Sequence, residues 1–180
     1  MAERNSEEEH APEPSATELD ETDVRILQLL QENCKMSIME ISQEVDKGIS
    51  TVHARIKALE NSGVIKKYTA ILDSAKLSRQ TLAFVLIRIR YYAPGQEGML
   101  SQRDFCKEIA QHPLVQDVHV LSGEYDVLLK IRARDIDEIN HFIVDFLRHK
   151  PAVDRTLTMF AMDSYLESLE LRGLRSEKGP

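Results

Sequence analysis

Residues 37–63 read SIMEISQEVDKGISTVHARIKALENSG, with a helical repeat of apolar residues on each side of a polar turn. Ser37, followed three residues later by Glu40, has the pattern of a capping box, which marks the start of a helix. The turn falls at 46–48, and a second helix is expected from 49 to 61. The positions expected to face the core are Ile38, Ile41 and Val45 in the first helix and Val52, Ile56 and Leu59 in the second.

Another helix precedes this pair, and a β-rich segment follows it. Asp20 and Thr22 are residue types that begin helices, and Asn33 is suited to end one. The apolar face between them is formed by Val24, Ile26, Leu27, Leu29 and Leu30. Residues 64–72 (VIKKYTAIL) combine β-branched and aromatic residues, which predicts a strand. Three short helices and a following strand indicate a winged-type helix-turn-helix domain over residues 19–72.

From Thr81 onward the apolar pattern favours strands. Residues 73–80 are expected to form a hinge, and residues 81–170 a second domain, followed by a tail at 171–180. Strands are expected at 81–92, 114–122, 125–133 and 153–163, with helices at 104–111 and between Asp135 and Pro151. The second helix has an apolar stripe of Ile136, Ile139, Ile143 and Phe146. The order β-α-β-β-α-β is that of a ferredoxin-like domain with an antiparallel sheet, so the chain is expected to be of the α+β class.

Both faces of this sheet are expected to be apolar. On the first strand Ala83, Val85, Ile87 and Ile89 point one way, and Leu82, Phe84 and Leu86 point the other way. The last strand alternates Val153, Leu157 and Met159 with Phe160 and Met162. Helices can cover one face only, and an antiparallel sheet exposed to water normally has a polar outer face. A second copy of the chain is the expected cover, as a symmetric homodimer.

The net charge of −7 is distributed unevenly along the chain. Residues 1–21 hold eight acidic side chains and one basic side chain, so the remaining chain is neutral. Residues 47–67 hold five basic side chains, opposed by Glu60 alone. Because salt screens charges beyond about 8–10 Å, this local excess favours contact with nucleic acid despite the acidic total.

Residues 1–18 are expected to be a disordered acidic tail, because their few apolar residues cannot offset the entropy of ordering. Two roles remain open for this tail. It competes with DNA for the basic segment, or it is a solvated tail that aids solubility.

Cys34 and Cys106 are far apart in the sequence and predict free, buried thiols in a reducing compartment rather than a disulfide or a metal site. No run approaches the roughly 18 consecutive apolar residues of a membrane helix, and the first residues lack the apolar region of a signal peptide. We therefore expect a cytoplasmic protein with no membrane contact, no metal and no cofactor.

The face of the 49–61 helix opposite Val52 is small, polar and basic. A helix with such side chains can enter a DNA major groove, which is about 12 Å wide. Base edges are expected near Ser50, Thr51, His53 and Ala54, and phosphates near Lys47, Arg55, Lys57, Lys66 and Lys67. Two alternatives remain open: the face is simply solvated, and Arg55 forms a structural ion pair with an acid.

Five segments together carry a family resemblance: LDETDVRIL (19–27), STVHARIKALE (50–60), GVI (63–65), YTAILD (68–73) and GEYD (123–126). They resemble the Lrp/AsnC (leucine-responsive, feast/famine) transcription regulators, over residues 19 to about 170. The resemblance implies binding of double-stranded DNA, homodimers joined through their sheet faces, and further assembly into tetramers or octamers. It also implies a small-molecule effector, usually an amino acid, bound between dimers. One departure is Gly48, where the family usually has a serine at the start of the recognition helix.

In this family the GEYD segment is a hairpin of the effector domain. Gly123 would let backbone amides approach a carboxylate, and Glu124 or Asp126 would pair with an ammonium group. The residues expected at an effector site are Ser122, Gly123, Glu124, Tyr125, Asp126, Thr156 and Thr158. The alternative is a plain hairpin turn with a structural aspartate.

Three other functions are alternatives to a ligand-responsive regulator. An architectural DNA-binding protein would use its second domain for assembly only. An RNA-recognition module would need stacking aromatic residues, where the central strands carry mostly aliphatic ones, namely Leu82, Phe84, Leu86, Val127, Leu129 and Ile131. An enzyme is not expected, because no nucleophile–base pair, metal-ligand spacing or phosphate loop is visible.

Overall fold

The computed structural model describes residues 18–92 and 98–176, so residues 1–17 of the expected acidic tail lie outside the described part. The described chain forms two compact units. The first contains residues up to Ala70 together with the segment that begins at Ser168, and the second runs from Ile71 to Glu167.

The first unit contains three helices: α1 (Glu21–Glu32), α2 (Ile38–Val45) and α3 (Ile49–Asn61). Both α1 and α2 begin with reciprocal capping boxes, Asp20 with Asp23 and Ser37 with Glu40. These contacts satisfy backbone N–H groups that a helix start leaves without partners. The helices bury a common apolar cluster of Ile26, Leu27, Leu29, Ile41, Val52, Ile56 and Leu59. The expected helix-turn-helix arrangement is therefore confirmed.

The strand expected at 64–72 is wrong, because this segment has no regular secondary structure. Gly63 adopts a positive φ of 76°, and the Ile65 N–H donates to the Leu59 carbonyl, which ends α3. A strand exists only where a neighbouring strand accepts its hydrogen bonds, and the described residues offer none here. Ile71 and Leu72 are consequently exposed.

Cys34 also departs from expectation. It lies in the turn between α1 and α2 and is exposed, whereas Cys106 on α4 is half-buried; both are free thiols. The expectation of two buried thiols is therefore wrong for Cys34.

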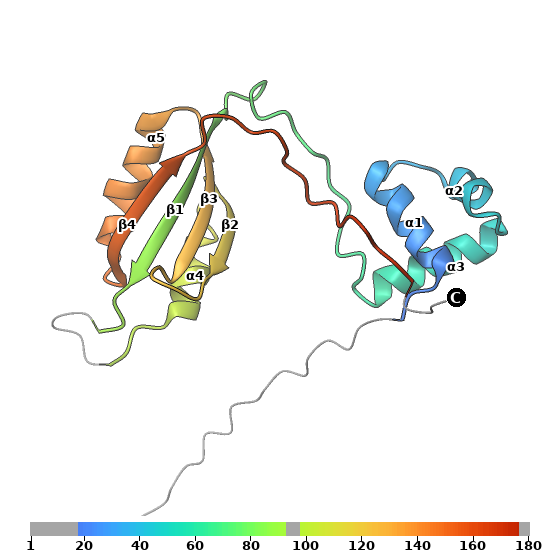
Figure 1. The fold of residues 1–180 in the computed structure, drawn as a ribbon, viewed down its shortest axis with the longest axis horizontal. Helices are drawn as coiled ribbons and strands as arrows, with labels where there is room; N and C mark the ends of the chain where they lie inside the picture. The colour runs from blue at the N-terminus through green and yellow to red at the C-terminus, as the bar shows by residue number, and fades with distance from the viewer. Residues whose placement is uncertain (1–17, 93–97, 177–180) are drawn as a thin grey trace, which may run out of the picture. The chain divides into compact units, whose positions relative to one another are not determined.

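The second unit is a four-stranded antiparallel sheet with the strand order β2-β3-β1-β4 (Figure 1). Its strands are β1 (Thr81–Ile89), β2 (Val115–Val120), β3 (Val127–Ala133) and β4 (Val153–Phe160). The helices are α4 (Gln102–Ile109) and α5 (Ile136–His141). Each expected strand and helix of this domain is present in the expected order, which confirms the ferredoxin-like topology.

Beyond His141, α5 continues as a π-helical turn (Phe142–Phe146) and a 3₁₀ turn (Leu147–His149). A π-helical turn contains more residues than an α-helical one and so rotates the residues that follow it. Leu147 is fully buried as a result, while Phe146 is only partly buried. Ile136, expected in the buried stripe, is exposed, so that part of the prediction is wrong.

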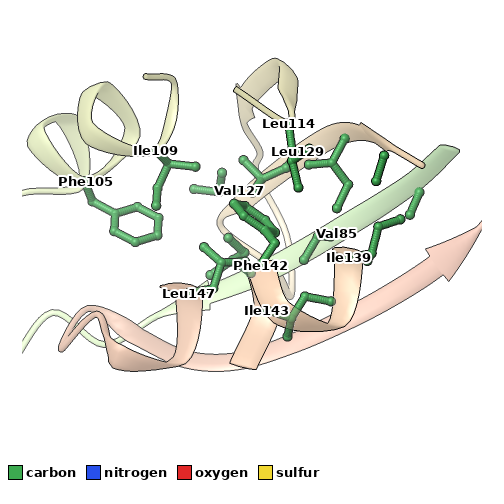
Figure 2. Packing of buried hydrophobic residues seen from close by; sticks show 14 of the residues in the cluster. Val85, Phe105, Ile109, Leu114, Val127, Leu129, Ile139, Phe142, Ile143 and Leu147 are labelled. Atoms are coloured by element: carbon green, nitrogen blue, oxygen red, sulfur yellow. The ribbon is translucent and has the colours of Figure 1, made fainter. Parts of the chain in front are cut away.

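One face of the sheet packs against the helices and forms the main apolar core (Figure 2). Val85 from β1 and Leu129 from β3 lie in this core with Ile109 of α4 and Ile139 of α5. Each such side chain contributes about 1.5–3 kcal/mol when it leaves water.

The opposite face of the sheet remains partly exposed. Phe84 of β1 pairs with Met159 of β4, and Leu86 of β1 pairs with Leu157 of β4. Because cross-strand partners share a face, these four residues form one apolar patch, which we call the open face. Leu157 and Met159 are each 43% exposed.

The expected grouping on β4 requires a correction. A register shift lies between Arg88 and Ile89, and Val153 pairs with Ile89. Val153 therefore packs against the helix-covered core rather than beside Leu157 and Met159. A bulge moves one residue to the other side of the pleat, and the sequence alternation alone does not reveal it.

Candidate nucleic-acid interface and effector hairpin

The helix α3 has one buried side and one exposed side. Val52, Ile56 and Leu59 are at most 9% exposed and pack into the cluster of the first unit. The side chains of the opposite face are exposed, namely Ser50, Thr51, His53, Ala54 and Lys57. The structure thus brings all four residues expected at base edges onto one accessible surface. Lys47, Lys66 and Lys67 are also exposed.

Arg55 forms a structural ion pair with acidic residues, which was the alternative to a phosphate contact. Its Nη1 lies 2.7 Å from Asp20 Oδ2 and 2.8 Å from Asp23 Oδ1, and its side chain is 30% exposed. The hydrogen bond to Asp23, then that to Asp20, raises the pKa of Arg55. The pKa of Asp20 is lowered, first by the hydrogen bond from the Asp23 backbone and also by Arg55. The guanidinium therefore joins α3 to the first turn of α1.

Lys57 is exposed but paired. Its Nζ lies 2.8 Å from Glu60 Oε2, and the Tyr68 hydroxyl donates to Glu60 Oε1 at 3.1 Å. These two donors, Lys57 first, lower the pKa of Glu60. Burial, then the bond to Glu60, raises the pKa of Tyr68. The sequence analysis assigned no role to Tyr68 and counted Glu60 only as a charge, although a Lys–Glu pair three residues apart on a helix was a visible signal.

The N-terminus of α3 begins at Gly48, which provides no side-chain hydrogen bond to the helix. A Cβ built there would meet only Thr51 Oγ1, at 3.9 Å. There is thus space for a side chain at this position, and the glycine is not required by crowding. Ile49, the next residue, is 54% exposed.

The hairpin after β2 is held by Asp126. The Ile89 N–H donates to Asp126 Oδ2 (2.7 Å) and the Tyr91 hydroxyl donates to Oδ1 (3.1 Å). The Asp126 N–H in turn donates to the Ile87 carbonyl. Both carboxylate oxygens therefore fasten the hairpin to the end of β1. Tyr91 was missed by the sequence analysis, because nothing local relates it to a residue 35 positions away.

The tip of the hairpin is open. Ser122, Gly123 and Glu124 are exposed, and a Cβ at Gly123 would contact nothing within 4 Å. Gly123 has a φ of 150°, which side-chain-bearing residues rarely adopt. Tyr125 is half-buried. The tip therefore offers accessible backbone together with the Glu124 carboxylate.

Thr156 and Thr158 lie on the other side of β1 from the hairpin. Thr156 pairs with Ile87 and Thr158 with Val85, so both hydroxyls are on the helix-covered face of β4. Both threonines are half-buried. The Ile87 carbonyl thus accepts a hydrogen bond from the Asp126 N–H of the hairpin, and Ile87 pairs with Thr156 on β4.

Within 18–92 and 98–176, no three His, Cys, Asp or Glu side chains gather as they would around a metal ion. In the same ranges no helix combines the length and the apolar character needed to cross a membrane.

Two family models match the chain. Residues 19–66 match a winged helix-turn-helix DNA-binding model, and residues 82–171 match the model of the Lrp/AsnC ligand binding domain. The chain is therefore similar, over nearly all of its described length, to DNA-binding regulators that carry a ligand-binding domain.

Individual relatives agree. The HTH-type transcriptional regulator FL11 of Pyrococcus horikoshii is 36% identical over 153 residues, which cover 85% of this chain and 95% of that protein. The transcriptional regulator AzlB of Bacillus subtilis is 35% identical over 146 residues, covering 81% of this chain and 90% of that protein. A crystal structure of a transcriptional regulator from Neisseria meningitidis in complex with L-methionine superposes with a TM-score of 0.77 at 29% identity, covering 85% of this chain and 96% of that one.

Proposed function

Because this chain belongs to the Lrp/AsnC family of helix-turn-helix transcription regulators, we propose that the outer face of α3 reads the major groove of double-stranded DNA. One observation carries this proposal. The apolar stripe of α3 is buried, and its opposite face exposes only short side chains and Lys57. Short side chains allow a helix to lie deep in a groove about 12 Å wide.

Within this interface the roles divide by reach and chemistry. The short side chains of Ser50, Thr51, His53 and Ala54 contact base edges, with hydroxyl and imidazole groups as hydrogen-bonding partners and Ala54 against a thymine methyl. The phosphates are bound by Lys47, Lys57, Lys66 and Lys67. Arg55 holds α3 in place through Asp20 and Asp23 and does not bind a phosphate in this proposal.

We further propose that an amino acid binds at the hairpin of residues 122–126 and modulates DNA binding. The open tip at Gly123 gives a carboxylate access to backbone amides, and Glu124 is exposed and can pair with an ammonium group. Asp126 shapes the hairpin rather than contacting the ligand. Thr156 and Thr158 remain candidates for hydroxyl contacts across β1. The L-methionine complex of the Neisseria relative supports an amino acid as the class of effector.

The partner of the open face in this proposal is a second copy of the chain. Four apolar side chains gather there (Phe84, Leu86, Leu157 and Met159), and a symmetric dimer buries each patch against its own copy. Such dimers can assemble further, into tetramers or octamers, and place two recognition helices on one DNA site. A DNA-bound regulator of this kind acts in the cytoplasm.

Selection of bound duplexes from a random DNA pool tests the proposal, with and without each of the twenty amino acids. An enriched motif whose recovery changes with one amino acid is the expected result. An enriched motif combined with no calorimetric heat from any amino acid would support an architectural DNA-binding protein instead. A protein that binds no duplex at low salt would overturn the regulator proposal.

A further inference from the structure

The helix-turn-helix unit contains residues from the far end of the chain. Residues 168–176, here called the C-terminal segment, group with α1–α3 rather than with the sheet (Figure 1). Leu174 packs against the buried cluster that contains Ile26 and Val52. The Lrp/AsnC ligand binding domain model extends to residue 171, so part of this segment is assigned to the other domain by sequence similarity.

Gln31 of α1 holds the backbone of this segment at one position. The Leu171 N–H donates to Gln31 Oε1 at 2.7 Å, and Gln31 Nε2 donates to the Leu171 carbonyl at 3.4 Å. One amide side chain therefore satisfies both backbone groups of Leu171. The Leu171 side chain itself is 69% exposed, so the contact depends on the backbone and not on burial of this residue.

The segment begins directly after Glu167, the last residue of the sheet unit. Glu167 forms an ion pair with Lys130 (3.0 Å) and another with Arg132, both on β3. The Arg132 side chain is 11% exposed and that of Lys130 is 25% exposed, so the site is sheltered from solvent. The bond from Lys130, followed by that from Arg132, lowers the pKa of Glu167. Glu167 is thus fixed as a carboxylate on β3.

We propose that the C-terminal segment is a fourth structural element of the DNA-binding unit. Gln31 holds its backbone at Leu171, and Leu174 completes the buried cluster of the three helices. The docking of the segment does not rest on the proposed DNA-binding function.

Hydrogen exchange read by mass spectrometry tests the docking in the full-length chain without DNA. In the wild type, the Leu171 amide is expected to exchange well below the rate of an unstructured peptide. Gln31→Ala removes both hydrogen bonds and is expected to speed exchange at Leu171 about fivefold, which corresponds to one hydrogen bond of about 1 kcal/mol. Alanine favours helix at least as well as glutamine, so α1 itself should be preserved.

Two matched variants sharpen the result. Gln31→Glu keeps an acceptor for the Leu171 N–H but loses the donor, so an intermediate rate is expected. Leu169→Ala removes a side chain that is 80% exposed and should leave the rate unchanged. Exchange at the unstructured rate in the wild type, or equal rates in the wild type and Gln31→Ala, would overturn the proposal.

Leu174→Ala provides an independent readout, because it removes packing from the helical cluster rather than a hydrogen bond. Exchange within α1 is expected to speed up severalfold, whereas Leu169→Ala should not change it. Unchanged protection of α1 would contradict the assignment of the segment to this unit. Protection of the segment that rises with protein concentration would contradict docking within one chain, since it would indicate docking on another copy.

Discussion

Arg55 Nη1 lies 2.8 Å from Asp23 Oδ1, and this ion pair joins the recognition helix α3 to the first turn of α1. Asp20, the N-cap of α1, receives a second bond from the same nitrogen. The arginine therefore fixes the orientation of α3. It also belongs to the basic segment of residues 47–67. Its structural role and a phosphate-binding role lead to different expectations for DNA binding.

Arg55→Ala is expected to lower the free energy of unfolding by about 1–2 kcal/mol, because it leaves two carboxylates without their donor. Urea unfolding followed by circular dichroism measures this loss. The dependence of DNA affinity on salt should keep its slope, since no phosphate contact is lost. A slope that falls by about 1 on a log–log plot would reassign Arg55 to a phosphate.

Lys57→Ala is the matched charge removal on the exposed face. It should weaken DNA binding by roughly 1–2 kcal/mol on every sequence and reduce the salt slope by about 1, because a phosphate contact is lost. Fluorescence anisotropy over a salt series gives both values. A loss restricted to one operator would assign Lys57 to base reading. Glu60→Gln serves as the control: it removes the carboxylate that competes for Lys57 and should strengthen DNA binding.

The elements that the sequence predicted well are those set by neighbouring residues. N-cap residue types placed α1, the capping box at Ser37 placed α2, and the apolar repeat after the 46–48 turn placed α3, because each signal lies within one or two helical turns. The segment 64–72 has the composition of a strand, yet strand formation depends on a partner edge that composition does not supply. The π-helical turn at 142–146 and the register shift between Arg88 and Ile89 were also not predicted, because each displaces the following residues by a single position.

In the candidate site, too, local features were predicted and contacts between distant residues were not. The exposed face of α3 follows from helical periodicity, and the four residues expected at base edges lie on it together with Lys57, whereas Arg55 does not. The partners of those residues do not follow, because Arg55 meets Asp20 across 35 positions and Gln31 meets Leu171 across 140. Such pairings become visible only when the fold brings distant segments together.

The hairpin of residues 122–126 is expected to depend on Asp126 for its stability. Asp126→Ala removes both acceptor oxygens and so leaves the Ile89 N–H and the Tyr91 hydroxyl without their partner. A loss of about 1–3 kcal/mol is expected in urea unfolding. Tyr91→Phe removes one of these bonds only and should cost less. If Asp126→Ala leaves stability unchanged but abolishes amino-acid binding, Asp126 contacts the ligand directly.

His112 is expected to make the stability of the second unit depend on pH. Its ring packs 4.6 Å from that of Phe142 and 4.7 Å from that of Phe146, and burial lowers its pKa from the ordinary 6.5. The charge of Glu138 acts in the opposite sense and raises the pKa of His112. Lys150 lies over the Phe146 ring and pairs with Glu108.

A histidine with a depressed pKa binds fewer protons in the folded state than in the unfolded state. The stability that it contributes is therefore complete above pH 6.5 and is lost as the pH falls through the folded-state pKa. Urea unfolding between pH 8 and pH 5 should show this fall, and His112→Phe should flatten it. His141 acts in the opposite sense, because the bond to Asp145 raises its pKa, and His141→Gln serves as the control. A fall that persists in His112→Phe would assign the effect to other groups.

The open face of the sheet is expected to hold the dimer together. Leu157→Lys places a charge at the centre of the patch formed with Phe84, Leu86 and Met159, and burying an unpaired ammonium group is costly. Light scattering coupled to size-exclusion chromatography should show dimers or larger assemblies for the wild type and a shift toward monomer for Leu157→Lys. Ile136→Lys introduces the same charge at an exposed position on α5 and should leave the assembly intact. If Leu157→Lys keeps the wild-type mass at micromolar concentration, the copies associate through another surface.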